Sequence, residues 1–148
     1  MELPLLLHIL GASILVGGLI TALSFQLVGW ARETPAGAAM LARYGFLSLL
    51  VLALPGWILM RAGAQWIWSE QGWDDVRDEP GWLDIGWFTG DLGLPVILVT
   101  VILAGLGARR LRQSGGTTSS LVRGATALTA IMLIANVVTV WAMSAKPD

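Results

Sequence analysis

The side chains best suited to chemistry are one histidine and a few polar residues inside apolar stretches. His8 is the only histidine, and it lies within an apolar run from Leu3 to Leu27. A neutral imidazole is a good ligand for haem iron and for copper. The alternative is structural, because a neutral histidine in a helix bundle can also donate a hydrogen bond to a carbonyl oxygen or to Asn136. His8 is therefore either a cofactor ligand or a packing residue.

A haem bound by His8 needs a second axial ligand, because the chain has no other histidine. Met60 and Met143 are the predicted candidates, and His8 of a second copy is the alternative. The predicted cofactor-binding residues are His8, Met60, Arg61, Asp91, Asn136 and Met143, with His8 as the metal ligand.

Arg61 and Asp91 are ionisable residues inside apolar stretches, where such groups are costly and are usually paired or functional. Three interpretations follow. The two residues form an ion pair that joins two helices, or they form a polar site for an anionic group such as a haem propionate or a quinone head. In the third interpretation the two side chains are not paired, and each extends to the membrane–water interface.

Composition indicates a membrane protein. The chain of 148 residues is 55 % hydrophobic and 13 % charged, with a mean hydropathy of +0.72, whereas soluble domains have roughly 25 % charged residues. The absence of cysteine excludes disulfides, thiolate metal sites, iron–sulfur clusters and cysteine nucleophiles. No phosphate-binding or dinucleotide motif is present, and no nucleic-acid partner is predicted.

Four apolar stretches predict membrane-spanning helices at about 3–28, 41–68, 87–108 and 121–143, since about 20 residues cross the hydrocarbon core. Pro55 should kink the second helix. Residues 69–86 are predicted to form an acidic, tryptophan-rich outer loop, which is either solvated or docks a basic cytochrome c-like protein. The predicted fold is an all-α, integral membrane, antiparallel four-helix bundle in a single domain, with the lipid bilayer as its main partner.

Arginines predict the orientation. They gather in the first and third connections, at Arg32, Arg43, Arg109, Arg110, Arg112 and Arg123. Positive residues concentrate on the cytoplasmic side, so both termini are predicted to be extracytoplasmic. The excess of arginine over lysine hints at a GC-rich bacterial genome, and the predicted location is a bacterial inner (plasma) membrane. The first stretch does not read as a cleaved signal peptide. It lacks the basic start of such a peptide, and its apolar run is longer than the apolar core of one.

The first helix has two faces of small residues. His8 shares one face with Gly11, Ala12, Leu15, Gly18, Ala22 and Gln26. The opposite face carries Ser13, Gly17, Thr21 and Ser24. Small residues at this spacing are typical of close helix packing. The second face is predicted to pack in the core or, alternatively, to form a homodimer or a larger membrane complex.

Three motifs carry a family resemblance: the opening Leu7-His8-Ile9-Leu10-Gly11, the pair Pro55-Gly56, and the ending Met143-Ser144-Ala145-Lys146-Pro147. Together they resemble a bacterial family of predicted integral membrane proteins of unknown function with four helices. The opening is also similar to the copper-resistance D proteins and to the four-helix protoporphyrinogen oxidases. That resemblance implies haem or metal at His8. The oxidases also use a lysine in a later helix, and the second to fourth predicted helices have none.

The sequence thus predicts a small, non-enzymatic, accessory or cofactor-binding subunit of a membrane redox system, with haem b or copper as the cofactor. The alternative is a structural or assembly subunit without a cofactor, in which His8, Arg61 and Asp91 serve helix packing. An oxidase-like or transporter-like activity is a third option.

Overall fold

The computed structural model describes residues 2–72 and 81–145, and every secondary-structure element within these ranges is helical. The elements are α1 (Glu2–Trp30), α2 (Pro35–Ser48), the π-helical turn η1 (Leu49–Ala53), α3 (Leu54–Gln71), α4 (Gly81–Ser114) and α5 (Ser120–Ala145). Since α2, η1 and α3 run on without a break from Pro35 to Gln71, the chain forms four long helical rods, each long and apolar enough to cross a membrane. The all-α prediction is confirmed.

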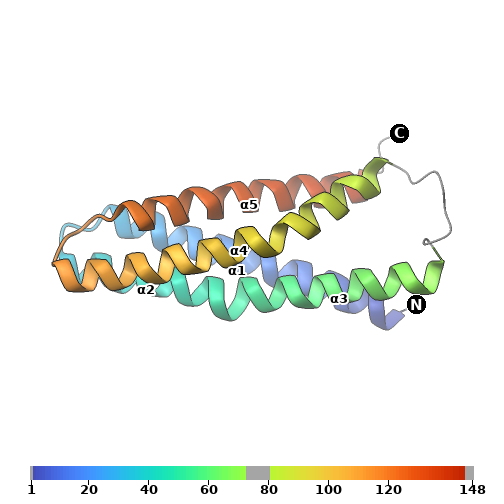
Figure 1. The fold of residues 1–148 in the computed structure, drawn as a ribbon, viewed down its shortest axis with the longest axis horizontal. Helices are drawn as coiled ribbons and strands as arrows, with labels where there is room; N and C mark the ends of the chain where they lie inside the picture. The colour runs from blue at the N-terminus through green and yellow to red at the C-terminus, as the bar shows by residue number, and fades with distance from the viewer. Residues whose placement is uncertain (1, 73–80, 146–148) are drawn as a thin grey trace.

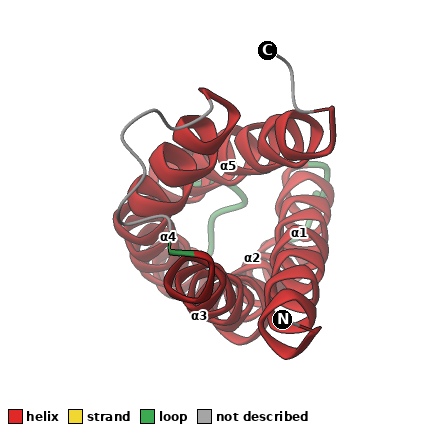
Figure 2. Ribbon diagram, turned by 90° about the vertical axis from the view of Figure 1, so that its right-hand side faces the viewer, coloured by secondary structure: helices red, strands yellow, loops and turns green. Residues whose placement is uncertain are grey.

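The rods form an antiparallel four-helix bundle. The first rod packs against the α2–η1–α3 rod and against α5, and α4 packs against α2 and α5. Viewed along its axis, the bundle is a ring of four rods (Figure 2). The beginning of α1 and the end of α5 lie at one end, which we call the terminal end, and the connections between α1 and α2 and between α4 and α5 lie at the other, which we call the arginine end (Figure 1).

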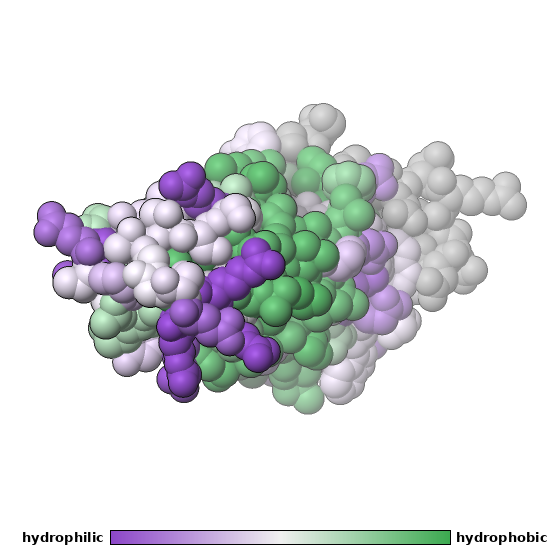
Figure 3. All heavy atoms as spheres, turned by 60° about the vertical axis from the view of Figure 1, so that its left-hand side comes forward, coloured by the Kyte–Doolittle hydropathy of each residue, from purple (hydrophilic) through white to green (hydrophobic). Residues whose placement is uncertain are grey.

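The outer surface of the bundle is apolar over its middle. Figure 3 shows an apolar band between the polar surface of the arginine end and further polar surface toward the terminal end. Large side chains are exposed along every rod, including Ile20, Val51, Ile102 and Ile134. So large an apolar surface is unfavourable in water and favourable in lipid, which agrees with the predicted membrane bundle.

Pro55 acts through the turn that precedes it. A proline in a helix lacks an N–H, and its ring clashes with the carbonyl four residues back. Here the helix widens into η1, where the Leu54 N–H donates to the Leu49 carbonyl, five residues back. Leu49 and Ala53 are fully buried, while Pro55 itself faces outward. The predicted distortion is therefore present as a π-helical turn.

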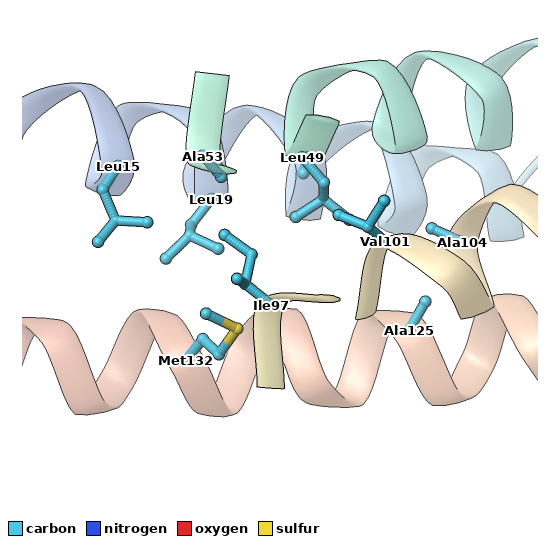
Figure 4. Close-up of a cluster of buried hydrophobic side chains, with 10 residues drawn as sticks. Leu15, Leu19, Leu49, Ala53, Ile97, Val101, Ala104, Ala125 and Met132 are labelled. Atoms are coloured by element: carbon cyan, nitrogen blue, oxygen red, sulfur yellow. The ribbon is translucent and has the colours of Figure 1, made fainter. Parts of the chain in front are cut away.

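The centre of the bundle is filled by a cluster from all four rods. Leu15 and Leu19 of α1, Leu49 and Ala53 of η1, Ile97, Val101 and Ala104 of α4, and Ala125 and Met132 of α5 meet there (Figure 4). This packing fills the middle of the bundle.

Glycines let α1 and α3 approach until their backbones touch. A Cβ atom added at Gly56 would lie 2.5 Å from the Leu15 nitrogen, and one added at Gly63 would lie 2.5 Å from the His8 nitrogen. One at Gly11 would overlap the Met60 nitrogen, and one at Gly18 would lie 2.7 Å from the Ala53 nitrogen. We call Gly11, Gly18, Gly56 and Gly63 the glycine seam. The seam presses His8 against α3.

Candidate ligand pocket

His8 is held by α3 through one of its two ring nitrogens. Its Nδ1 lies 3.0 Å from the carbonyl oxygen of Met60. Because a carbonyl can only accept a hydrogen bond, Nδ1 must carry the proton, and in the neutral ring Nε2 is then an acceptor. The prediction that His8 donates to a carbonyl is confirmed, and the carbonyl is that of Met60 rather than a group of Asn136. No described residue forms a hydrogen bond with Nε2.

A cavity of about 240 Å³ lies beside His8, toward the terminal end of the bundle. All four rods contribute to its walls, which are mostly apolar, as at Val16, Ile67 and Leu83. Five of the six predicted site residues line it, namely His8, Met60, Arg61, Asn136 and Met143. The sixth, Asp91, is not a lining residue but is bonded to Arg61. The fold thus brings the predicted set together from four helices that are distant in sequence.

The wall formed by α5 is polar at two points. Asn136 donates through Nδ2 to the Met132 carbonyl of its own helix at 2.9 Å. The hydroxyls of Thr139 and Thr89 lie 2.9 Å apart and join α5 to α4. Asn136 therefore does not hold His8, and its amide oxygen remains available as an acceptor at the cavity wall.

Met143 is positioned by the glycine opposite it. A Cβ atom added at Gly86 would overlap the terminal methyl of Met143, so this side chain lies directly on the α4 backbone. Met60 is placed from the other side, where the glycine seam fixes its backbone against α1. The cavity is thus lined by one histidine and two methionines, each on a different rod.

Arg61 is fully engaged at the cavity rim. Its Nη2 lies 2.9 Å from Oδ1 of Asp91, its Nη1 lies 3.4 Å from the amide oxygen of Gln65, and its guanidinium carbon is 4.2 Å from the centre of the Trp87 ring. The predicted ion pair between the second and third rods is confirmed. Since Asp91 is 64 % exposed, the pair contributes little stability. The guanidinium is neither unpaired nor free for another anion in this arrangement.

Three tryptophans that sequence reasoning left out of the site complete its surroundings. Trp57 donates through Nε1 to the Gly90 carbonyl at 3.2 Å, which joins α3 to α4. Trp68 and Trp87 both line the cavity and contact each other edge to face, with ring centres 4.8 Å apart. The sequence shows only that Gly86, Gly90 and Gly93 repeat at helical spacing, which is typical of a closely packed helix face but does not identify the tryptophans that pack there.

The glycine repeat was not recognised as one helix face because residues 69–86 were predicted to form a loop, which put Gly86 outside the helix. In the structure the stretch up to Gln71 belongs to α3, and α4 begins at Gly81 rather than at 87. Gly86 is therefore helical, and it shares a face with Gly90 and Gly93. The central part of the predicted loop, with most of its carboxylates, lies outside the described residues, as does the Lys146-Pro147 ending.

The two faces of α1 have different surroundings. The His8 face is buried in the bundle at Gly11, Leu15, Gly18, Ala22 and Gln26. The opposite face is on the outside, where the hydroxyls of Ser13, Thr21 and Ser24 donate to carbonyls of their own helix at 2.7–2.8 Å. A Cβ atom added at Gly17 would touch nothing. The prediction that this face packs in the core is wrong, and its role in a homodimer stays a prediction.

Among the described residues, no group of three or more histidine, cysteine, aspartate or glutamate side chains could hold a metal ion. Besides His8, the residues with donor atoms that line the cavity include Met60, Met143 and Asn136. Comparison of the chain with models of protein families, with curated proteins and with solved structures finds no match.

Proposed function

We propose that this chain is an accessory subunit of a membrane redox system, and that its pocket binds a redox cofactor, copper or haem b, through Nε2 of His8. One observation carries the proposal. The Nδ1–H of His8 is fixed on the Met60 carbonyl, and Nε2 has no hydrogen-bond partner among the described residues, in a side chain that lines the cavity. Histidines that bind metals usually donate their other ring N–H to a carbonyl or carboxylate, which fixes the ring and increases its basicity.

The residues present fit copper better than haem. The imidazole of His8 and the thioethers of Met60 and Met143 are neutral donors; thioethers are soft ligands that favour Cu(I), and imidazole also suits copper. The same His8 and one methionine could serve as the two axial ligands of a haem. However, a cavity of about 240 Å³ is below the range of roughly 300–1,000 Å³ that is usual for pockets of larger ligands. Either group would supply a one-electron couple to the membrane system.

The surroundings keep the pocket electrically neutral. Arg61 and Asp91 cancel each other at the rim, and Asn136 and Thr139 contribute only uncharged dipoles. The apolar walls exclude water and the donors add no charge, which favours a singly charged ion over a doubly charged one. This supports Cu(I) rather than Cu(II) as the bound form.

The proposed location follows from the same bundle. The arginine end carries Arg32, Arg43, Arg109, Arg110, Arg112 and Arg123. Positive residues mark the cytoplasmic side, so we place this end in the cytoplasm of a bacterial inner membrane. The termini and the His8 pocket then lie toward the extracytoplasmic side, where the pocket would be reached by a periplasmic or extracellular redox partner.

Purified protein in mild detergent tests the proposal through an absorption spectrum, a metal analysis and a titration with Cu(I). We expect binding near one equivalent for the unaltered chain and none for His8→Ala. Ser13→Ala is the matched control, because Ser13 lies on the outer face of the same helix. A colourless protein that takes up no copper, or His8→Ala with unchanged copper or haem content, would overturn the proposal.

A second candidate is a structural or assembly subunit without a cofactor. The glycine seam and the His8–Met60 hydrogen bond favour it, because both serve helix packing without a ligand. His8→Gln separates the two functions, since the glutamine amide can still donate to the Met60 carbonyl but is a poor metal ligand. Under the structural alternative, His8→Gln keeps both the stability and the yield of the unaltered chain, and no copper or haem is bound by either protein.

A further inference from the structure

A second hollow of about 790 Å³ lies at the arginine end, between α2 and α4. Three arginines, Arg43, Arg109 and Arg112, stand on its walls with Tyr44 and Gln113. None of the three guanidinium groups forms a salt bridge to a carboxylate within the part of the chain that the structure describes. The hollow therefore combines three positive charges that have no acidic partner there.

Apart from Tyr44 and Gln113, the rest of the groove is lined by apolar residues and glycine. Its walls include Ala36, Ala39 and Met40 of α2 and Gly105 and Ala108 of α4. Small residues on both helices leave room along the groove, and Phe46 lies at its deeper end against Gly105. Figure 3 shows charged side chains reaching over the edge of the apolar band at this end of the bundle. The groove thus has arginines that suit an anionic headgroup beside apolar walls that suit a hydrocarbon chain.

The N-terminus of α2 adds positive charge on the same side. Thr34 makes no side-chain cap, and Ala36, in the first turn of α2, lines the groove. The uncapped amides of a helix N-terminus favour anions. Arginine also suits phosphate, because its planar fork can bind two phosphate oxygens at once.

We propose that this groove binds one anionic glycerophospholipid, with its phosphate on Arg43, Arg109 and Arg112 and one acyl chain along the Met40–Phe46 side of α2. The apolar walls select a lipid over a soluble phosphate compound, because a hydrocarbon chain fills them and a small anion does not. The site is separate from the His8 pocket, so the two proposals can fail independently.

Lipid binding to the purified full chain, measured by native mass spectrometry with phosphatidylglycerol and with phosphatidylcholine of the same chains, tests this. The test variant is the triple change Arg43→Gln, Arg109→Gln and Arg112→Gln. The matched control removes the same charge outside the groove, through Arg32→Gln, Arg110→Gln and Arg123→Gln. At about fivefold per arginine, we expect roughly hundredfold weaker phosphatidylglycerol binding in the test variant, and a change of only a few-fold in the control.

Three results would overturn the proposal. Equal binding of phosphatidylcholine, whose choline group cancels the charge of its phosphate, would show that the net negative charge of the lipid headgroup is not recognised. Equal losses in both triple variants would show diffuse attraction by the whole arginine end. Displacement of the lipid by millimolar inorganic phosphate would point to a free anion site. If the triple variant fails to fold, the neighbouring single changes Arg109→Gln and Arg110→Gln replace it, with about fivefold weakening expected only for the first.

Discussion

Replacing Gly56 with alanine should destabilise the bundle, although alanine is the better helix former. Both Gly56→Ala and its control, Gly17→Ala, gain about 1 kcal/mol of helix propensity. At Gly56 the new Cβ would lie 2.5 Å from the Leu15 nitrogen, about 0.9 Å short of the 3.4 Å at which ordinary contact begins. At Gly17 it would meet nothing within 4 Å.

The loss of stability expected for Gly56→Ala depends on which atoms the added Cβ would meet. The obstructing atoms are backbone atoms of α1, so no side-chain rotation can relieve the overlap, and the two helices must move apart. Overpacking of this kind costs about 1–3 kcal/mol, and a backbone contact belongs at the upper end. After the gain in propensity, we expect Gly56→Ala to lose about 2 kcal/mol and Gly17→Ala to gain about 1 kcal/mol.

Thermal unfolding of the two variants in the same detergent measures this difference. For a chain of this length, 1 kcal/mol corresponds to a shift of about 2–4 °C in Tm, so the two variants should differ by about 6–12 °C. Equal Tm values for Gly56→Ala and Gly17→Ala would refute the close approach of α1 and α3, and with it the placement of His8 against Met60.

Three further substitutions test separate contacts, each by the change in Tm. Gln26→Met should raise the stability by about 1–3 kcal/mol, because both amide atoms of the buried Gln26 lack a hydrogen-bond partner within residues 2–72 and 81–145; a loss of stability would show that the amide has a polar partner. Asp91→Asn should cost no more than about 1 kcal/mol, because exposed ion pairs contribute little; a much larger loss would contradict the exposure of this carboxylate. Trp57→Phe should cost about 1–2 kcal/mol, because it removes the donor to the Gly90 carbonyl; an unchanged Tm would contradict this bond.

The four rods could be predicted because lipid offers no hydrogen-bond partners to the backbone of a membrane-spanning chain. Backbone groups must be bonded within each span, so long apolar stretches have to be helical. The Arg61–Asp91 pair was also predictable, since ionisable residues in adjacent spans near the same interface are usually paired. Their positions along the helices were sufficient for that inference.

The faces of the helices were harder to predict, because lipid is as apolar as the protein interior. Hydrophobicity therefore does not tell the inside of a membrane bundle from its outside. Ser13, Thr21 and Ser24 looked like core residues, yet they can face outward because each hydroxyl is satisfied by its own helix. Small residues signal close contact, but their spacing does not say which helix will be the partner.

Other features depend on contacts that no local pattern contains. The π-helical turn before Pro55 is a choice among several distortions that relieve the same clash. The start of α4 at Gly81 lies before the repeat of Gly86, Gly90 and Gly93, in a short stretch that mixes aromatic, apolar and acidic residues without a helical period. The tryptophans of the pocket became recognisable as site residues only when α3 and α4 were placed side by side.

The position of the pocket in the chain has a consequence for biosynthesis. The helical hairpin of α1 and α3 is complete by Gln71, and it already contains the glycine seam and the bond between His8 and Met60. Asn136 and Met143 arrive with α5, near the end of synthesis. Since membrane chains are made from the N-terminus onward, the imidazole is oriented first and the cavity is closed last. A ligand bound between His8 and α5 would then stabilise the contact between the first hairpin and the later hairpin of α4 and α5 after both have been synthesised.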